Sequence, residues 1–288
     1  YQLKPYNETH SFIFSINFVD AQIFSCYAGT RSGGWDVNGQ VVCGPIALFN
    51  RPAGAAMDVA GNLYIADQLN HCIRKRSPAG IFTTLAGSGQ KGSSDGLGTI
   101  ASFNNPTGVA VDVDGNIYVA DRDNNKIRKI TPAGMVSTYA GTGETYGNKY
   151  LDGVALSATF NGPSGIALDV SGKLYLADTY NNCIRIISIT GMVSTLAGSA
   201  TSGASDGTGL NAKFNSPTSL VLDAMGNIYV ADSENNKIRK ITSAGVVTSF
   251  AGSGVAGSLD ATGTAATFFK PCGITIDAAG ILYVADTG

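Results

Sequence analysis

Residues 103–143 read FNNPTGVAVDVDGNIYVADRDNNKIRKITPAGMVSTYAGTG, and this stretch predicts four short antiparallel β-strands. Turn residues at 114–116, a polar bend at 123–125 and a Pro-Ala-Gly turn at 132–134 separate four apolar or β-rich runs. The four strands are expected at residues 109–112, 117–120, 127–131 and 135–139.

This unit recurs along the whole chain. The tetrapeptide Tyr-aliphatic-Ala-Asp ends at five positions separated by 54, 57, 54 and 54 residues, namely Asp67, Asp121, Asp178, Asp232 and Asp286. Four strands in a repeat of this length predict a propeller blade with a long inter-blade loop. Helical repeats are excluded, because no copy has an apolar period of 3.6 residues that lasts beyond two turns.

The repeated pattern is Pro-x-Gly, Asp-x-x-Gly-Asn-aliphatic-Tyr-Val-Ala-Asp, Asn-Asn-Lys-Ile-Arg and Gly-x-Val-Ser-Thr-aromatic-Ala-Gly. It resembles the NHL repeat over roughly residues 23–288. The resemblance implies an all-β fold, a β-propeller of four-stranded antiparallel blades. NHL proteins include protein-binding, RNA-binding, sensor and enzymatic members, so the resemblance alone does not assign a function.

The repeats predict a single domain over residues 1–288 with five blades. After a polar segment at 1–14, four complete blades are expected at about 45–88, 103–142, 160–199 and 214–253. Residues 15–30 and 268–288 would form the two halves of a composite fifth blade, and this pairing of the two ends would remove the exposed sheet edges. The alternative is a fragment of a larger propeller.

Composition argues against several partners. Only 40 of 288 residues are charged and the net charge is −2, which gives no general attraction to nucleic acid or acidic membranes. No transmembrane segment is predicted, because no run of about 18 apolar residues is present.

Few residues suggest catalysis. The two histidines, His10 and His71, cannot make a three-histidine zinc site, and there is no nucleophile elbow or phosphate-binding loop. Carboxylates in the inter-blade loops could hold calcium if they converged, but each is expected to cap its own loop: Asp36, Asp95, Asp152, Asp206 and Asp260. We therefore predict no catalytic residue, metal or cofactor, and a protein that is not an enzyme.

An aspartate and an arginine seven residues apart recur in every complete copy. They could form a ring of charges around a channel, but a feature present in every blade is more simply architectural, with each aspartate holding its bend or pairing with its arginine. The pairs are Asp67 with Arg74, Asp121 with Arg128, Asp178 with Arg185, and Asp232 with Arg239.

The bends and the inter-blade loops share one face, which we predict to be the partner-binding face. Exposed amides and aromatic groups there suit contact with a protein or a glycan. The predicted residues are Asn70, His71, Asn124, Asn125, Asn181, Asn182, Asn235, Asn236, Trp35, Tyr146 and Tyr150. His71 stands where the other blades have asparagine and is expected to face solvent.

Cysteines and a sequon favour an extracellular or cell-surface location. Cys43 could reach Cys72 or Cys272 and form a disulfide in an oxidising compartment. Asn7 begins the Asn-Glu-Thr sequon at which a glycan is expected.

The sequence thus predicts a non-enzymatic extracellular or cell-surface propeller. It would be either an interaction module for a protein or a glycan, or a structural subunit that self-assembles into a filament. One alternative is a propeller hydrolase or lyase with a metal in its channel. The other is RNA binding, for which basic residues on two blades are interrupted by the blade that contains Cys183 and Ile186. No nucleic-acid partner is therefore predicted.

Overall fold

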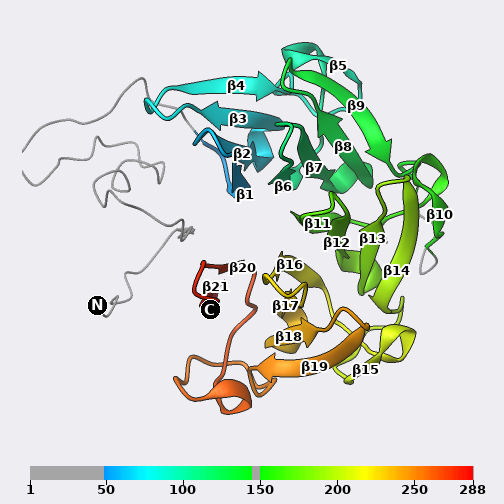
Figure 1. The fold of residues 1–288 in the computed structure, drawn as a ribbon, viewed down its shortest axis with the longest axis vertical. Coiled ribbons are helices and arrows are strands. Elements are labelled where there is room, and N and C mark those ends of the chain that lie inside the picture. The colour runs from blue at the N-terminus through cyan, green and yellow to red at the C-terminus, as the bar shows by residue number, and fades with distance from the viewer. Residues whose placement is uncertain (1–48, 145–149, 288) are drawn as a thin grey trace, which may run out of the picture.

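A computed structural model of the chain describes residues 49–144 and 150–287. Within them, four complete blades and one half-blade follow one another around an arc (Figure 1). The chain is all-β with antiparallel blades arranged as a propeller, which confirms the predicted fold class. Five blades in a closed ring remains a prediction.

Every complete blade has its first strand innermost, and neighbouring strands are antiparallel. The first blade contains β1 (Pro52–Met57), β2 (Leu63–Asp67), β3 (Cys72–Arg76) and β4 (Phe82–Ala86). The second contains β6 (Pro106–Val111), β7 (Ile117–Asp121), β8 (Lys126–Ile130) and β9 (Met135–Ala140). The third contains β11 (Pro163–Leu168), β12 (Leu174–Asp178), β13 (Cys183–Ile187) and β14 (Met192–Gly198). The fourth contains β16 (Pro217–Leu222), β17 (Ile228–Asp232), β18 (Lys237–Ile241) and β19 (Val246–Ala251). The half-blade contains β20 (Gly273–Ile276) and β21 (Leu282–Ala285).

Three blades carry a fifth, two-residue strand that the sequence did not predict. It comes from the preceding inter-blade loop and pairs with the outermost strand of the blade, covering an edge that would otherwise be open. These strands are β5 (Gly96–Leu97), β10 (Gly153–Val154) and β15 (Gly207–Thr208). Each is followed by a one-turn 3-10 helix: η3 (Gly98–Ile100), η5 (Ala155–Ser157) and η7 (Gly209–Asn211), and η9 (Gly263–Ala265) occupies the same place before the half-blade.

An aspartate organises the turn between the first and second strands. In the second blade, Asp112 Oδ1 accepts the backbone N–H of Asn116 at 2.8 Å, and Oδ2 accepts the Asn116 amide at 2.9 Å. The carboxylate thus satisfies the turn's backbone locally, as expected of Asx-type turns. The same Oδ1 bond recurs at Asp58, Asp169, Asp223 and Asp277.

The apolar core lies between neighbouring blades. One cluster joins Tyr118 and Ile127 of the second blade to Ile166 and Leu174 of the third, and similar clusters lie at the other blade junctions. Glycine in Pro-x-Gly allows the close approach of inner strands, because a Cβ at Gly108 would collide with the backbone oxygen of Ser164. Among the described residues, no helix has the length and apolar character needed to cross a membrane.

Candidate interaction face

A one-turn 3-10 helix forms the bend between the second and third strands of each complete blade. These helices are η2 (Gln68–Asn70), η4 (Arg122–Asn124), η6 (Thr179–Asn181) and η8 (Ser233–Asn235). In η4, Asp121 Oδ1 accepts the backbone N–H of Asn104 at 2.8 Å, and its Oδ2 accepts the Asn124 amide at 2.8 Å. The bend is therefore held by the aspartate that ends the second strand.

The asparagine that ends each 3-10 helix donates a hydrogen bond within its own blade. Asn70, Asn181 and Asn235 donate to the aspartate of their own blade as Asn124 does. Asn181 is only 2% exposed, so the structure places it inside the bend and not on the face where it was expected. Asn124 and Asn235 also donate to inter-blade-loop carbonyls, those of Gly92 and Gly203.

The residue after each 3-10 helix ties one blade to the next. Asn125, Asn182 and Asn236 have φ of 53°, 52° and 53°, in the left-handed region that asparagine tolerates. Their side-chain oxygens accept the backbone N–H groups of Gly162, Ser216 and Lys270 at 2.8, 2.9 and 2.9 Å. These amides therefore serve blade-to-blade contacts.

His71 performs the same role with a ring nitrogen. Its φ is 50°, and its Nδ1 accepts the backbone N–H of Asn105 at 3.1 Å. Burial, followed by the charge of Lys91, lowers the pKa of His71, which favours the neutral ring that this bond requires. His71 is 7% exposed, so the expectation that it faces solvent was wrong. Nδ1 replaces the asparagine oxygen as the acceptor.

A buried arginine clamps each of three blades to its preceding loop. Arg128 is inaccessible to solvent, and it donates to Asp121 Oδ2 at 2.8 Å and to Asp95 Oδ1 at 2.6 Å. Its guanidinium lies 5.3 Å from the centre of the Phe103 ring. The equivalent groups are Arg185 with Asp178, Asp152 and Phe160, and Arg239 with Asp232, Asp206 and Phe214.

The clamp modifies two expectations. Loop aspartates Asp95, Asp152 and Asp206 bind these arginines, a role that their constant spacing of 33 residues could have revealed. In the first blade, Asp67 and Arg74 form no ion pair, and Arg74 instead donates to Thr84 Oγ1 at 2.6 Å. Of the two predicted roles, Asp67 therefore has the first: it holds its bend by accepting the backbone N–H of Asn50 and the Asn70 amide.

The exposed positions of the bends differ from blade to blade. The middle residue of the four 3-10 helices is Leu69, Asp123, Tyr180 or Glu234, and all four are exposed. Tyr180 is 50% exposed, and its ring meets the Arg122 guanidinium, whose Nη2 donates to the Tyr180 hydroxyl. Sequence reasoning missed this set, although variation beside the constant Asp and Asn residues is visible in an alignment of the repeats.

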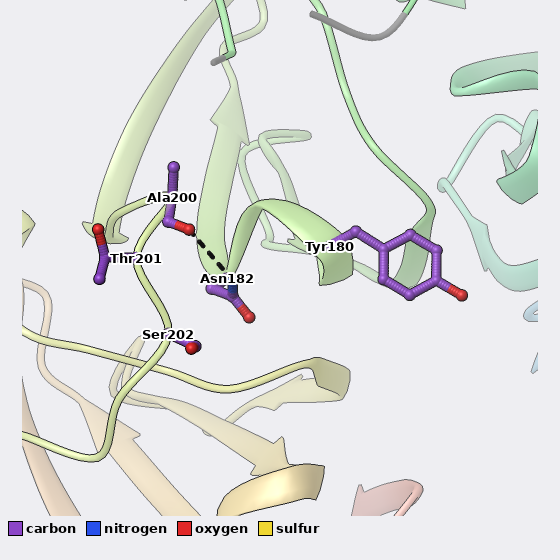
Figure 2. Close-up of a pocket in the computed structure, with 5 residues that line it drawn as sticks. All are labelled: Tyr180, Asn182, Ala200, Thr201 and Ser202. Atoms are coloured by element: carbon purple, nitrogen blue, oxygen red, sulfur yellow. Dashed lines mark hydrogen bonds between the residues drawn. The ribbon is translucent and has the colours of Figure 1, made fainter. Parts of the chain in front are cut away.

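A polar hollow of about 410 Å³ opens on the same face (Figure 2). It is lined by Tyr180, Asn182, Ala200, Thr201 and Ser202, so it joins a bend to the following inter-blade loop. Asn182 donates to the Ala200 carbonyl at 3.3 Å, and the Tyr180 ring points away from the other lining residues (Figure 2). The hollow therefore offers hydroxyl and backbone groups with an aromatic side chain at its rim.

The other predicted residues are a tyrosine beside a clamp, two described cysteines, and several residues outside the described part of the chain. Tyr150 stacks on the clamp arginine Arg185, with 4.6 Å between the guanidinium carbon and the ring centre. Cys72, Cys183 and Cys272 form no disulfide with one another within the described residues, and burial raises the pKa of the Cys72 thiol to about 11. Asn7, Trp35, Cys43 and Tyr146 lie outside the described residues, as do Asp36 and residues 15–30.

Within residues 49–144 and 150–287, no three His, Cys, Asp or Glu side chains are grouped to hold a metal ion.

The sequence model of the NHL repeat family matches four segments of the chain, residues 49–75, 103–130, 160–187 and 214–241. Each match begins at the phenylalanine before a blade and runs to its third strand. The chain belongs to the NHL-repeat family.

Several curated proteins are similar to this NHL chain. Protein SUPPRESSOR OF QUENCHING 1, chloroplastic, from Arabidopsis thaliana is 33% identical over 84% of the chain and 24% of its own length. Teneurin-3 from Danio rerio is 34% identical over 68% of the chain and 8% of its length. NHL repeat-containing protein 2 from Bos taurus is 30% identical over 83% of the chain and 38% of its length. The NHL chain thus spans less than half of each of these relatives.

Solved propellers share the fold. An auxiliary nutrient binding protein from Bacteroides ovatus has a TM-score of 0.63 at 18% identity, covering 83% of this chain and 57% of that one. Virginiamycin B lyase from Staphylococcus aureus has a TM-score of 0.53 at 18% identity, covering 82% and 63%. At such identities, the likeness establishes the propeller architecture alone.

Proposed function

We propose that this NHL propeller is a non-enzymatic module that binds a protein partner through its bend face. The observation that carries the proposal is the contrast within each bend between constant buried residues and a varied exposed one. Each complete blade keeps the aspartate and the final asparagine, whereas the exposed middle residue is aliphatic, acidic or aromatic.

This contrast is what a repeated scaffold for recognition requires. The constant side chains are satisfied by internal hydrogen bonds and hold the bends rigidly, so contacts to a partner would come from the side chains that vary. Leu69, Arg122 and Tyr180 offer apolar, guanidinium and aromatic groups, and tyrosine and arginine are the residue types that dominate binding energy at protein interfaces. The hollow beside Tyr180 would receive a partner side chain.

The location and the covalent modifications are proposed from the sequence. Low charge, the sequon at Asn7 and a disulfide from Cys43 to Cys72 or Cys272 would fit an extracellular or cell-surface protein. Mass spectrometry of material from its source would test both modifications. An unmodified Asn7 together with five reduced cysteines would contradict this part of the proposal.

The binding proposal is tested with two variants that differ only in the face they alter. One carries Leu69→Ser and Tyr180→Ser on the bend face. The control carries Val113→Ser and Val170→Ser at hairpin tips, where these side chains are 87% and 110% exposed. Proteins retained from an extract of the source organism by immobilised wild type are quantified by mass spectrometry for all three forms.

We expect a defined set of proteins to be retained by the wild type and the hairpin-tip variant, and to fall at least tenfold on the bend-face variant. Equal retention by all three forms, or a loss confined to the hairpin-tip variant, would contradict binding through the bend face. Circular dichroism and thermal melting establish that both variants are folded.

A further inference from the structure

One of the four blade-to-blade contacts at the bends has a titratable acceptor. At three junctions the acceptor is the amide oxygen of the asparagine that follows the 3-10 helix, namely Asn125, Asn182 or Asn236. At the first junction it is Nδ1 of His71, which lies 3.1 Å from the backbone nitrogen of Asn105. An amide oxygen accepts at any pH, whereas a ring nitrogen accepts only while it is unprotonated. The hydrogen bond of the first junction therefore depends on the protonation state of one side chain.

The fold holds the His71 ring in this contact. Its φ of 50° matches the 52–53° of the three asparagines, and its backbone N–H bonds to the Gln68 carbonyl at 3.2 Å. The residue is only 7% exposed, so the ring cannot take water as a partner without moving. A proton on Nδ1 would point at the Asn105 N–H, and two donors would then face each other. Protonation thus replaces an attractive contact by a repulsive one.

The charged groups around the ring act in opposite directions. Burial, followed by the charge of Lys91 on the preceding inter-blade loop, lowers the pKa of His71, and Asp123 of η4 raises it by a smaller amount. In the bend of His71 itself, Asp67 accepts hydrogen bonds from two asparagines, and burial raises the pKa of the Cys72 thiol. The net effect on His71 is a pKa below the ordinary 6.5. The folded junction therefore disfavours the charged ring more than the unfolded chain does.

The contact extends to the surface of the second blade. Asn105 has a φ of 53°, and its side-chain amide donates to Asp123 Oδ2. Asp123 is the exposed middle residue of η4. Loss of the bond from Asn105 to His71 would loosen the residue that positions this carboxylate, so a change at the buried ring would reach the bend face.

We propose that His71 makes the junction between the first and second blades an acid-sensitive contact, closed while the ring is neutral and released when the ring is protonated. The asparagine junctions have no such response. The stabilisation from the contact is fully present above about pH 6.5 and is lost as the pH falls through the lowered pKa of the folded ring. The inference goes beyond the proposed binding function and does not depend on it.

The first experiment compares wild type with His71→Asn at pH 7.5 and pH 5. The melting temperature of the wild type should fall by about 2–4 °C more than that of the variant, because only the wild type loses an acceptor. The carboxyl groups and His10 are common to both proteins, so the difference isolates His71. An equal fall in both, or a smaller fall in the wild type, would overturn the proposal.

The second experiment locates the effect by amide hydrogen exchange, measured by NMR at the same two pH values. In the wild type, the protection factor of the Asn105 amide should fall about fivefold or more at pH 5 relative to those of Gly162 and Ser216. In His71→Asn the three amides should respond alike. A parallel loss at all three amides in the wild type would show that acid destabilises the whole propeller and would overturn a local contact.

The third experiment transfers the response to another junction. Asn125→His in the His71→Asn background places a ring nitrogen opposite the Gly162 N–H, at a φ of 53° that histidine tolerates. The acid-dependent loss of protection should now appear at Gly162 and be absent at Asn105. A folded variant in which Gly162 keeps its protection at pH 5 would show that the acceptor atom does not determine the response, which would overturn the proposal.

Discussion

The second blade and the half-blade have a phenylalanine and an aspartate at equivalent positions, but these residues are buried to different degrees. Phe103 and Asp121 are inaccessible to solvent, whereas Phe268 is partly exposed and Asp286 is exposed. The loop before the second blade adds strand β5 to its outer edge, but the equivalent loop residues 261–262 form no strand before β20. The comparison shows that the first two strands of a blade are enough to form its inner hairpin. The phenylalanine and the aspartate of the clamp are buried only where the third and fourth strands are also present.

The clamp arginine explains much of this difference. In the second blade, and in the same way in the third and fourth, it joins the end of the second strand, the third strand and the preceding loop through one buried guanidinium. Burying a carboxylate without a countercharge is costly unless hydrogen bonds satisfy it, as those from the Asn50 backbone and the Asn70 amide do for Asp67 in the first blade. The half-blade keeps its aspartate near solvent instead.

The largest expected effect comes from removing a clamp in a complete blade. Arg185→Met would leave the buried Asp178 carboxylate without its countercharge and should lower the free energy of unfolding by about 3–5 kcal/mol. Arg74→Met is the matched control, because Arg74 makes no ion pair among the described residues and donates to Thr84, and the substitution should cost about 1 kcal/mol. Urea denaturation measures both. Equal losses would contradict a special role for the clamp.

The next effect concerns the inner strands. Gly108→Ala should lower the free energy of unfolding by about 1–3 kcal/mol, because the added Cβ collides with the backbone of the third blade. At the matching position of the half-blade, a Cβ on Gly273 would meet only the Ala285 side chain, at 3.4 Å.

Gly273→Ala should therefore change the stability by less than about 0.5 kcal/mol. Urea denaturation of the two alanine variants compares the positions directly. A loss as large as that of Gly108→Ala would show that a further inner strand packs on β20, as a closed five-blade ring requires.

Much of this architecture could be predicted from the sequence, because each repeat contains the motifs that define its strands and turns. The Tyr-aliphatic-Ala-Asp strand, the Asn-Asn bend and the Pro-Ala-Gly turn define strands locally, and five similar copies predict a propeller. The contacts between repeats were harder to predict. Asp95 reaches Arg128 across 33 residues, and the only sign of this contact in the sequence is that the same spacing recurs between Asp152 and Arg185 and between Asp206 and Arg239.

The asparagines that the sequence assigned to the partner-binding face do lie at the bends, but their side chains make internal contacts. Asn181, for example, is expected to be exposed from its polar side chain, but its amide donates to Asp178 and it is only 2% exposed. Such a contact becomes visible only when the three-dimensional arrangement of the blade is known. The exposed, varied positions such as Tyr180 are next to them in the chain. These positions could have been selected from an alignment of the repeats. The polar residues that are constant in the alignment would be taken as structural, and the positions that vary would be taken as candidates for binding.

A smaller effect is expected at the blade-to-blade contact of His71. His71→Asn should be nearly neutral, because the amide oxygen can replace Nδ1 as the acceptor and asparagine suits a φ of 50°. His71→Ala removes the acceptor and should lower the free energy of unfolding by about 1–2 kcal/mol. Thermal and urea unfolding distinguish them. If both substitutions cost the same, the bond to Asn105 does not stabilise the first junction.

The smallest effect concerns the hairpin turns, in which the complete blades and the half-blade are alike. Desolvation opposes ionisation of Asp223, but hydrogen bonds from Asn227 and Met225 outweigh it, so its pKa lies below the ordinary 3.8. Hydrogen bonds, led by that from the Ile281 backbone, likewise lower the pKa of Asp277. In the unfolded chain both carboxyls take up protons near the ordinary value, whereas the folded turns keep them charged to lower pH.

The stabilisation from these turns is therefore fully present above about pH 4 and is lost as the pH falls through the lowered folded pKa values. The melting temperature should drop between about pH 4 and about pH 2, and Asp223→Asn and Asp277→Asn should each reduce the drop slightly. A reduction for Asp223→Asn alone would mean that the β20–β21 turn is not formed as the turns of the complete blades are. Equal reductions would place the difference between the two kinds of blade entirely beyond the first hairpin, at the clamp.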